Sequence, residues 1–126
     1  MSEVTTRVCA FRLDGEGFVF ATMKDGARFE LDDAKEAVEA TREVAGHVRR
    51  PVLVDMRRIQ SESREARAYF GSADVARYFS AVALLVSSPL SRMIANFFLR
   101  VSSHPLPTRL FDDERSAREW LRGFVP

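Results

Sequence analysis

The sequence has very few of the residues from which reactive and metal-binding sites are usually built. Cys9 is the only cysteine among 126 residues, and there are only two histidines, His47 and His104. A lone cysteine excludes an intramolecular disulfide and a zinc site made of several cysteines. The histidines have no serine or cysteine partner at motif spacing, and no nucleophile elbow, phosphate-binding loop or zinc-protease motif occurs. We therefore expect no catalytic residue, metal or cofactor, and a protein that is not an enzyme.

Long apolar runs and an excess of one charge are missing too. The longest apolar run, residues 81–86, is far too short to cross a bilayer, and no apolar segment follows a basic patch near the N-terminus. We therefore expect no membrane span and a cytoplasmic location. Basic and acidic residues number 19 and 18, a balance that argues against nucleic-acid binding.

The composition is that of a folded domain. Hydrophobic residues make up 46% of the chain and charged residues 29%, which excludes a disordered polypeptide. A chain of this length buries about two thirds of its unfolded surface. No repeat, low-complexity tract or linker divides it, so we expect a single domain over residues 1–126.

The first third is predicted to form three short strands in a meander. Turn signals at residues 14–17 and 24–26 separate runs rich in valine and phenylalanine. The strands are expected at residues 8–13, 18–23 and 27–31. Cys9, in the first of them, is expected to be a small core residue.

A helix is predicted next. Asp32 or Asp33 is suited to cap its first amide groups, apolar side chains recur at helical spacing, and Pro51 is expected to end it. Residues 51–56 form an apolar run closed by Asp55, which is typical of a buried parallel strand.

Residues 57–63 are interpreted as a loop leading into a second helix. Ser61 or Ser63 is expected to cap this helix, and the pair Gly71 and Ser72 to break it into two short pieces. A second buried strand is expected over residues 81–86.

Ser87, Ser88 and Pro89 predict the start of a third helix, because serine caps helices and proline suits the first helical position. Ala95 and Leu99 are expected to point away from its buried face. That face is predicted to carry Leu90, Met93, Ile94, Phe97, Phe98 and Val101.

The last strand is expected at residues 108–111, followed by a helix capped by Asp112 or Asp113. Strands that alternate with helices predict a mostly parallel central sheet, with about four helices and an antiparallel edge formed by the first strands. Six residues are predicted to be buried in this α/β domain: Leu53, Val54, Ala83, Leu85, Phe97 and Trp120.

The element order resembles the SpoIIAA-like, or STAS, fold of anti-sigma-factor antagonists, in which a phosphorylatable serine follows a strand that ends in aspartate. Residues 52–55 and then Ser61, Glu62 and Ser63 are similar to that region, and residues 80–94 are similar to an uncharacterised bacterial STAS/SEC14-type family. An ungapped alignment places Arg64 at the phosphorylated position, and a shift of one residue places Ser63 there. The resemblance implies a STAS-like domain with a regulatory role.

Two predicted loops are candidates for a binding rim. Ligands of open parallel sheets bind at the carboxyl ends of the strands, where two predicted helices begin and offer amide groups to an anion. Helix capping and solvation explain the same serines and arginines as well. The candidate rim comprises Asp55, Arg57, Arg58, Ser61, Ser63, Arg64, Ser87, Ser88 and Arg92.

Two functions remain open at this stage. The first is a non-catalytic regulatory module that binds a protein partner, forms a homodimer and responds to phosphorylation at Ser61 or Ser63. The second is a carrier of a small molecule or lipid, with an apolar pocket near the third helix. A small anion at the rim is a further candidate ligand.

Overall fold

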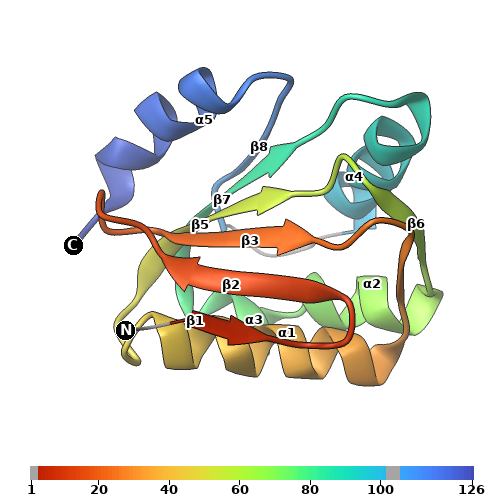
Figure 1. Cartoon of the computed structure of the whole chain (residues 1–126), viewed down its shortest axis with the longest axis horizontal. Coiled ribbons are helices and arrows are strands. Elements are labelled where there is room, and N and C mark those ends of the chain that lie inside the picture. Colours follow the sequence, from red (N-terminus) through yellow and green to blue (C-terminus); the bar gives the residue numbers. More distant parts are fainter. Residues whose placement is uncertain (1–2, 102–105) are drawn as a thin grey trace.

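The computed structural model describes residues 3–101 and 106–126 and is built around one six-stranded sheet (Figure 1). Counted across the sheet, neighbouring strands are antiparallel among the first three and parallel among the last four, so the third strand has one neighbour of each kind. This confirms the predicted sheet and its antiparallel edge. In spatial order the strands are β1 (Glu3–Thr5), β2 (Cys9–Leu13), β3 (Val19–Met23), β5 (Arg50–Asp55), β7 (Phe79–Leu85) and β8 (Thr108–Phe111).

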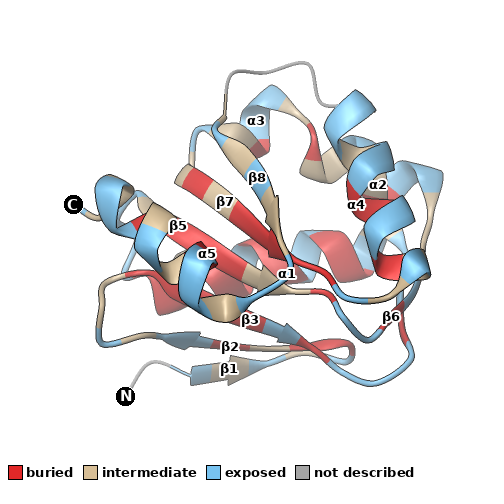
Figure 2. Cartoon of the chain, turned by 90° about the horizontal axis from the view of Figure 1, so that it is seen from above, coloured by how far each residue is buried: buried red, intermediate tan, exposed pale blue. Residues whose placement is uncertain are grey.

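The helices cover both faces of the sheet (Figures 1 and 2). One face carries α1 (Leu31–Val44), α2 (Arg64–Phe70), α3 (Ala73–Ala76) and α4 (Pro89–Val101), and the other carries α5 (Glu114–Leu121). A short 3₁₀ turn, Arg122–Phe124, follows α5. The predicted break at Gly71 and Ser72 is present, since Ser72 caps α3.

The alternation of side chains along β5 divides the core in two. Leu53 points to the face covered by α5, whereas Val52 and Val54 point to the opposite face. Of the residues predicted to be buried, Leu53, Ala83 and Leu85 are fully buried, while Val54 and Trp120 are partly buried. Cys9 is 2% exposed, which confirms it as a core residue.

A second, two-stranded sheet corrects two predictions. β4 (Ala27–Phe29) pairs in parallel with β6 (Ile59–Glu62) instead of completing the meander. Residues 57–63 are therefore not only a loop. The chain after β5 returns beside β4, where the Ser63 amide donates to the Phe29 carbonyl at 2.8 Å. The sequence also missed β1 and placed the start of α1 late, because Glu30 caps this helix and Asp33 closes its capping box.

Pro51 does not end α1, which already stops at Val44. Gly46 and His47 have φ angles of 69° and 58°, and this left-handed pair turns the chain away from the helix. Pro51 lies in β5, where the pairing with β7 is irregular between Arg50 and Val52. Its missing amide is tolerated there because a regular ladder does not require it.

The predicted buried face of α4 is partly wrong. Met93 and Phe97 are 59% and 48% exposed, whereas Ala95 is fully buried. Ser91, also fully buried, accepts hydrogen bonds from the amides of Ser87 and Ser88, so the helix turns its small residues toward the sheet. Leu99 is exposed as expected, and the side chain of Val101 lies outside the described residues.

Candidate ligand-binding cavity

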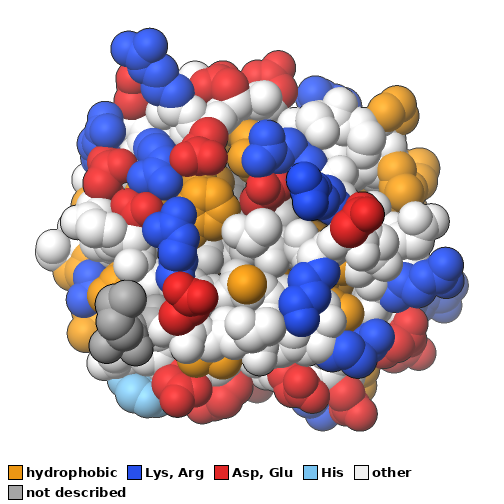
Figure 3. Space-filling view, viewed as in Figure 1, with side chains coloured by type: hydrophobic (Ala, Val, Ile, Leu, Met, Phe, Trp, Pro, Cys, Tyr) orange, Lys and Arg blue, Asp and Glu red, His pale blue; other side chains and the backbone are white. Residues whose placement is uncertain are grey.

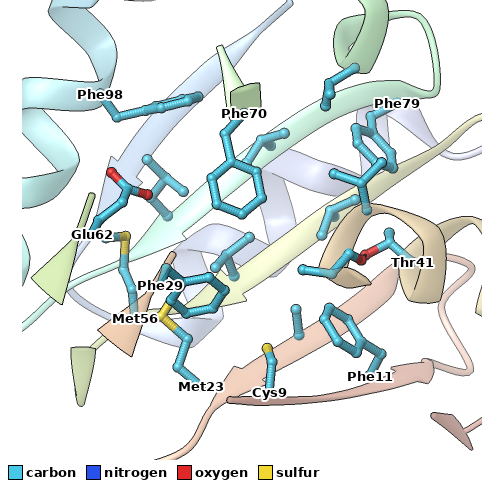
Figure 4. Close-up of a pocket in the computed structure, with 18 of the residues that line it drawn as sticks. Cys9, Phe11, Met23, Phe29, Thr41, Met56, Glu62, Phe70, Phe79 and Phe98 are labelled. Atoms are coloured by element: carbon cyan, nitrogen blue, oxygen red, sulfur yellow. The ribbon is translucent and has the colours of Figure 1, made fainter. Parts of the chain in front are cut away.

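An apolar cavity of about 110 Å³ lies between the sheet and the helices α1–α4. Its floor comes from β2, β3, β5 and β7, and Figure 4 shows side chains from opposite sides of the fold converging on it. The half-buried Phe70, Phe98 and Leu106 mark its outer part, near α2, α4 and the start of β8.

Apart from the methionines, three side chains in the lining carry an oxygen or sulfur atom: Cys9, Thr41 and Glu62. The first two have no charge to offer a ligand. The Thr41 hydroxyl donates to the Ala37 carbonyl at 2.7 Å, within its own helix. Burial raises the pKa of the Cys9 thiol to about 12, so this group remains a neutral thiol. The third is Glu62, the one ionisable carboxyl group in the lining.

Glu62 is the last residue of β6, and its side chain is 7% exposed. Burial raises the pKa of its carboxyl group to about 7, although the charge of Arg67 opposes that rise. Oε1 lies 3.5 Å from Arg67 Nε, which is close enough for charge attraction but longer than a usual hydrogen bond. Neither atom has a hydrogen-bond partner among the described residues.

Arg67 is held between three elements. It lies on α2, its Nη2 donates weakly to the Glu62 carbonyl at 3.4 Å, and its guanidinium lies 4.3 Å from the centre of the Phe97 ring on α4. The side chain is 18% exposed. The pair of Glu62 and Arg67 thus forms a polar group where β6, α2 and α4 meet.

The structure divides the predicted rim. Asp55 and Leu85 are register partners in β5 and β7, so Asp55 and Ser87 follow neighbouring strand ends. Arg57 Nε and Nη2 donate to the Asp55 carboxylate at 2.9 and 2.7 Å. Burial acts to raise the pKa of Asp55, but the bonds from Arg57 outweigh it and hold the pKa below its usual value.

The serines of the rim already have local roles. Ser63 Oγ accepts from the Ala66 amide at 3.0 Å and caps α2, as predicted, whereas Ser61 lies within β6. Ser88 Oγ accepts from the Ser91 amide at 3.0 Å. Helix capping accounts for these contacts, and an anion-binding role for the rim stays a prediction.

The arginines of the rim do not converge on one point. Arg58 and Arg64 are exposed. Arg92 is also exposed and lies in a separate shallow polar pocket with Arg109 and Ser116, beside β8 and α5.

Sequence reasoning missed Glu62 as a cavity residue. The polar run from Gln60 to Ser63 has the composition of a surface loop, and only the pairing of β6 with β4 carries Glu62 inward. An acidic residue between two polar ones is no signal of burial. An apolar pocket near the third helix was one of the two alternatives that the sequence left open, and Ile94 and Phe98 of α4 line the cavity.

The model of a domain of unknown function, DUF7793, matches residues 11–125. The chain belongs to this family. An uncharacterised DUF3478 family protein with a SpoIIAA-like fold, from Shewanella loihica PV-4, is similar in structure with a TM-score of 0.62 at 14% identity, over 94% of this chain and 98% of that one. The likeness confirms the SpoIIAA-like fold expected from the element order.

A protein of unknown function from Arthrobacter sp. FB24 is 35% identical over 96% of this chain and 98% of its own, with a TM-score of 0.35. No curated protein matches the chain. Within residues 3–101 and 106–126 of this DUF7793 domain, no three histidine, cysteine or acidic side chains gather as a metal site. Over the same residues, no helix has the length and hydrophobicity needed to cross a membrane.

Proposed function

We propose that the protein is a binding module that holds a small apolar molecule in the cavity beneath α4. The SpoIIAA-like fold is consistent with a binding or regulatory module. The observation that supports this particular function is the cavity itself, which measures about 110 Å³ and in which Glu62 is the one side chain with a carboxyl group.

An unfilled apolar cavity of this size is costly. At the ~24 cal/mol per Å³ found for closed engineered cavities, an empty space of this size lowers stability by at most roughly 2–3 kcal/mol, and by less here because the cavity is partly open to solvent. Protein cores normally lack such voids, and an engineered apolar cavity of about 150 Å³ binds benzene. A bound apolar molecule would recover the contacts that this cavity lacks.

The test is titration of the full-length protein with toluene, followed by NMR of ¹³C-labelled methionine methyl groups. Met23 and Met56 line the cavity, whereas Met93 is 59% exposed on α4 and serves as the internal control. We expect the methyl signals of Met23 and Met56 to shift and that of Met93 to stay. Unchanged signals up to the solubility of toluene would contradict the proposal.

A cavity-filling variant makes the test specific. Ala37 lines the cavity from α1, and a leucine there would occupy part of the space. We expect Ala37→Leu to weaken toluene binding at least tenfold while the chain stays folded. Undiminished binding by the folded variant would mean that toluene binds elsewhere.

A second candidate function is a protein interaction, which we propose as self-association through α4. Met93 and Phe97 are 59% and 48% exposed and lie one helical turn apart, and hydrophobic side chains reach the surface over α4 (Figure 3). Two-fold dimers are the commonest assemblies. Sedimentation velocity is expected to show a dimer that Met93→Ser with Phe97→Ser makes monomeric. A wild-type monomer at high micromolar concentration would exclude it.

A further inference from the structure

Glu62 lines the apolar cavity, and Arg67, whose Nε lies 3.5 Å from Glu62 Oε1, stands beside it, so the cavity has one polar end. We propose that the cavity selects apolar molecules that end in a neutral hydroxyl group, and that this hydroxyl bonds to Glu62 and Arg67. The inference rests on the proposed function, since it names the chemical class of the molecule that the cavity holds.

The first support is a pair of buried atoms that lack hydrogen bonds. Glu62 Oε1 and Arg67 Nε have no hydrogen-bond partner among the described residues, and their side chains are 7% and 18% exposed. Buried polar groups are nearly always bonded. A water molecule is suited to this place in the free protein, and a ligand group that replaces it must make the same bonds.

The second support is the spacing of these two atoms. Oε1 and Nε are 3.5 Å apart, so a single oxygen atom can lie at about 2.8 Å, a usual hydrogen-bond length, from both. A hydroxyl oxygen both donates and accepts. Its O–H would donate to Glu62 Oε1 while it accepts the N–H of Arg67.

The third support is the balance of charge. Above about pH 7, where Glu62 has lost its proton, Glu62 and Arg67 carry opposite charges 3.5 Å apart, so together they add no net charge to this end of the cavity. A carboxylate ligand would be repelled by Glu62, and an ammonium ligand by Arg67, in surroundings where an uncompensated charge is costly. A neutral hydroxyl leaves the pair balanced, which favours alcohols and phenols over fatty acids and amines.

The position of Glu62 directs the ligand. In Figure 4 its carboxyl group lies at one end of the cavity, near Phe98 and Met56, with Phe79 and Thr41 at the opposite end. The cavity of about 110 Å³ is smaller than the engineered cavity of about 150 Å³ that binds benzene, so the apolar body that it holds is no larger than one aromatic ring. The hydroxyl would therefore lie toward α2 and α4, and the ring toward β7 and α1.

The experiment compares four probes that share one ring: toluene, benzyl alcohol, benzylammonium and benzoate. Each is titrated into the full-length protein at pH 8, with the Met23 and Met56 methyl signals as the readout. We expect benzyl alcohol to bind at least tenfold more tightly than either charged probe. Tighter binding of benzoate or benzylammonium would overturn the hydroxyl preference.

The matched variants are Glu62→Leu and, as the control, Glu65→Leu, because Glu65 is exposed at the start of α2. Glu62→Leu is expected to lower the affinity for benzyl alcohol relative to toluene at least tenfold, and Glu65→Leu to leave that ratio unchanged.

An unchanged ratio in Glu62→Leu would overturn hydroxyl recognition, while toluene binding would still support the cavity as a binding site. If no probe binds the wild-type protein, both proposals are wrong. If Glu62→Leu does not fold, the relative affinities of the wild-type protein for the four probes test hydroxyl recognition on their own.

Discussion

At the scale of the residue, Glu62 is a carboxyl group whose burial makes its charge change near neutral pH. The pKa of its carboxyl group is raised from 4.5 to about 7. In the unfolded chain the group loses its proton near its ordinary pKa, while the folded protein keeps the proton until about pH 7. Between these values the folded state binds more protons, so stability falls as pH rises.

We predict that the wild-type protein loses about 3 kcal/mol of unfolding free energy between pH 4.5 and pH 8 through this group. Glu62→Gln should remove most of that loss, because glutamine carries no charge to bury. Urea denaturation at pH 4.5 and pH 8 measures the difference. The pKa values of Asp14, Asp33 and Asp55 are lowered instead, so their contributions change only below the ordinary aspartate pKa. An identical pH dependence in the variant would contradict the assignment.

Leu53 is the residue on which the central strand depends most. It is fully buried in β5, between the register partners Phe20 and Ala83 of the neighbouring strands. Leu53→Ala is expected to cost about 2–5 kcal/mol, because it removes apolar contacts and leaves a cavity. Leu13→Ala is the control, since Leu13 is 36% exposed. Chemical denaturation that shows a loss below about 1 kcal/mol for Leu53→Ala would be incompatible with this packing.

At the scale of the element, α2 matters because it places Arg67 beside Glu62, which lines the cavity. This seven-residue helix is too short to be stable alone, so its cap and its packing hold it. Ser63 Oγ accepts from the Ala66 amide, and Ala66 is fully buried.

Ser63→Ala is therefore predicted to destabilise the protein by about 1 kcal/mol, the usual value of a lost cap. Ser61→Ala is the matched control, because Ser61 lies in β6 and caps no helix. Hydrogen exchange of the α2 amides, together with thermal unfolding, measures the effect. Equal effects of the two substitutions would show that the cap contributes nothing.

At the scale of the whole molecule, Arg118 joins the two ends of the chain. From α5 it donates to Asp14 and Glu16 in the turn between β2 and β3, at 3.1 and 2.8 Å, and to Glu114 at 2.8 Å. Its guanidinium lies 5.0 Å from the centre of the Phe18 ring. These contacts fix the C-terminal helix to the N-terminal hairpin.

We predict that Arg118→Met lowers the free energy of unfolding by about 2 kcal/mol, because it leaves the nearly buried Asp14 without its main partner. Arg115→Met removes another arginine of α5 whose ion pair with Glu119 is almost fully exposed, and it should change stability by less than about 0.5 kcal/mol. Urea denaturation at low salt compares the two. Similar small losses would mean that the network around Arg118 contributes no more than a surface pair.

The local signals in the sequence were sufficient for most of the architecture. The strand that ends at Asp55 and the strand at residues 108–111 occur as predicted. Ser63 and Asp113 cap their helices, and each is one of the two candidates that the sequence offered. These features depend on neighbouring residues, so periodicity and capping chemistry reveal them. The order of strands and helices then restricts the topology, because crossovers between parallel strands are right-handed.

What the sequence by itself determined is an α/β domain with a SpoIIAA-like order of elements and an apolar segment that becomes α4. Only the tertiary structure decided that β4 leaves the meander to pair with β6, that α4 turns Ser91 and Ala95 inward, and that Glu62 enters the cavity. Each of these depends on residues far apart in the chain. Strand pairing and side-chain burial depend on the free energy of whole packed layers. The residues next to Glu62 in the sequence therefore do not indicate that it lies beside Arg67 in an apolar cavity.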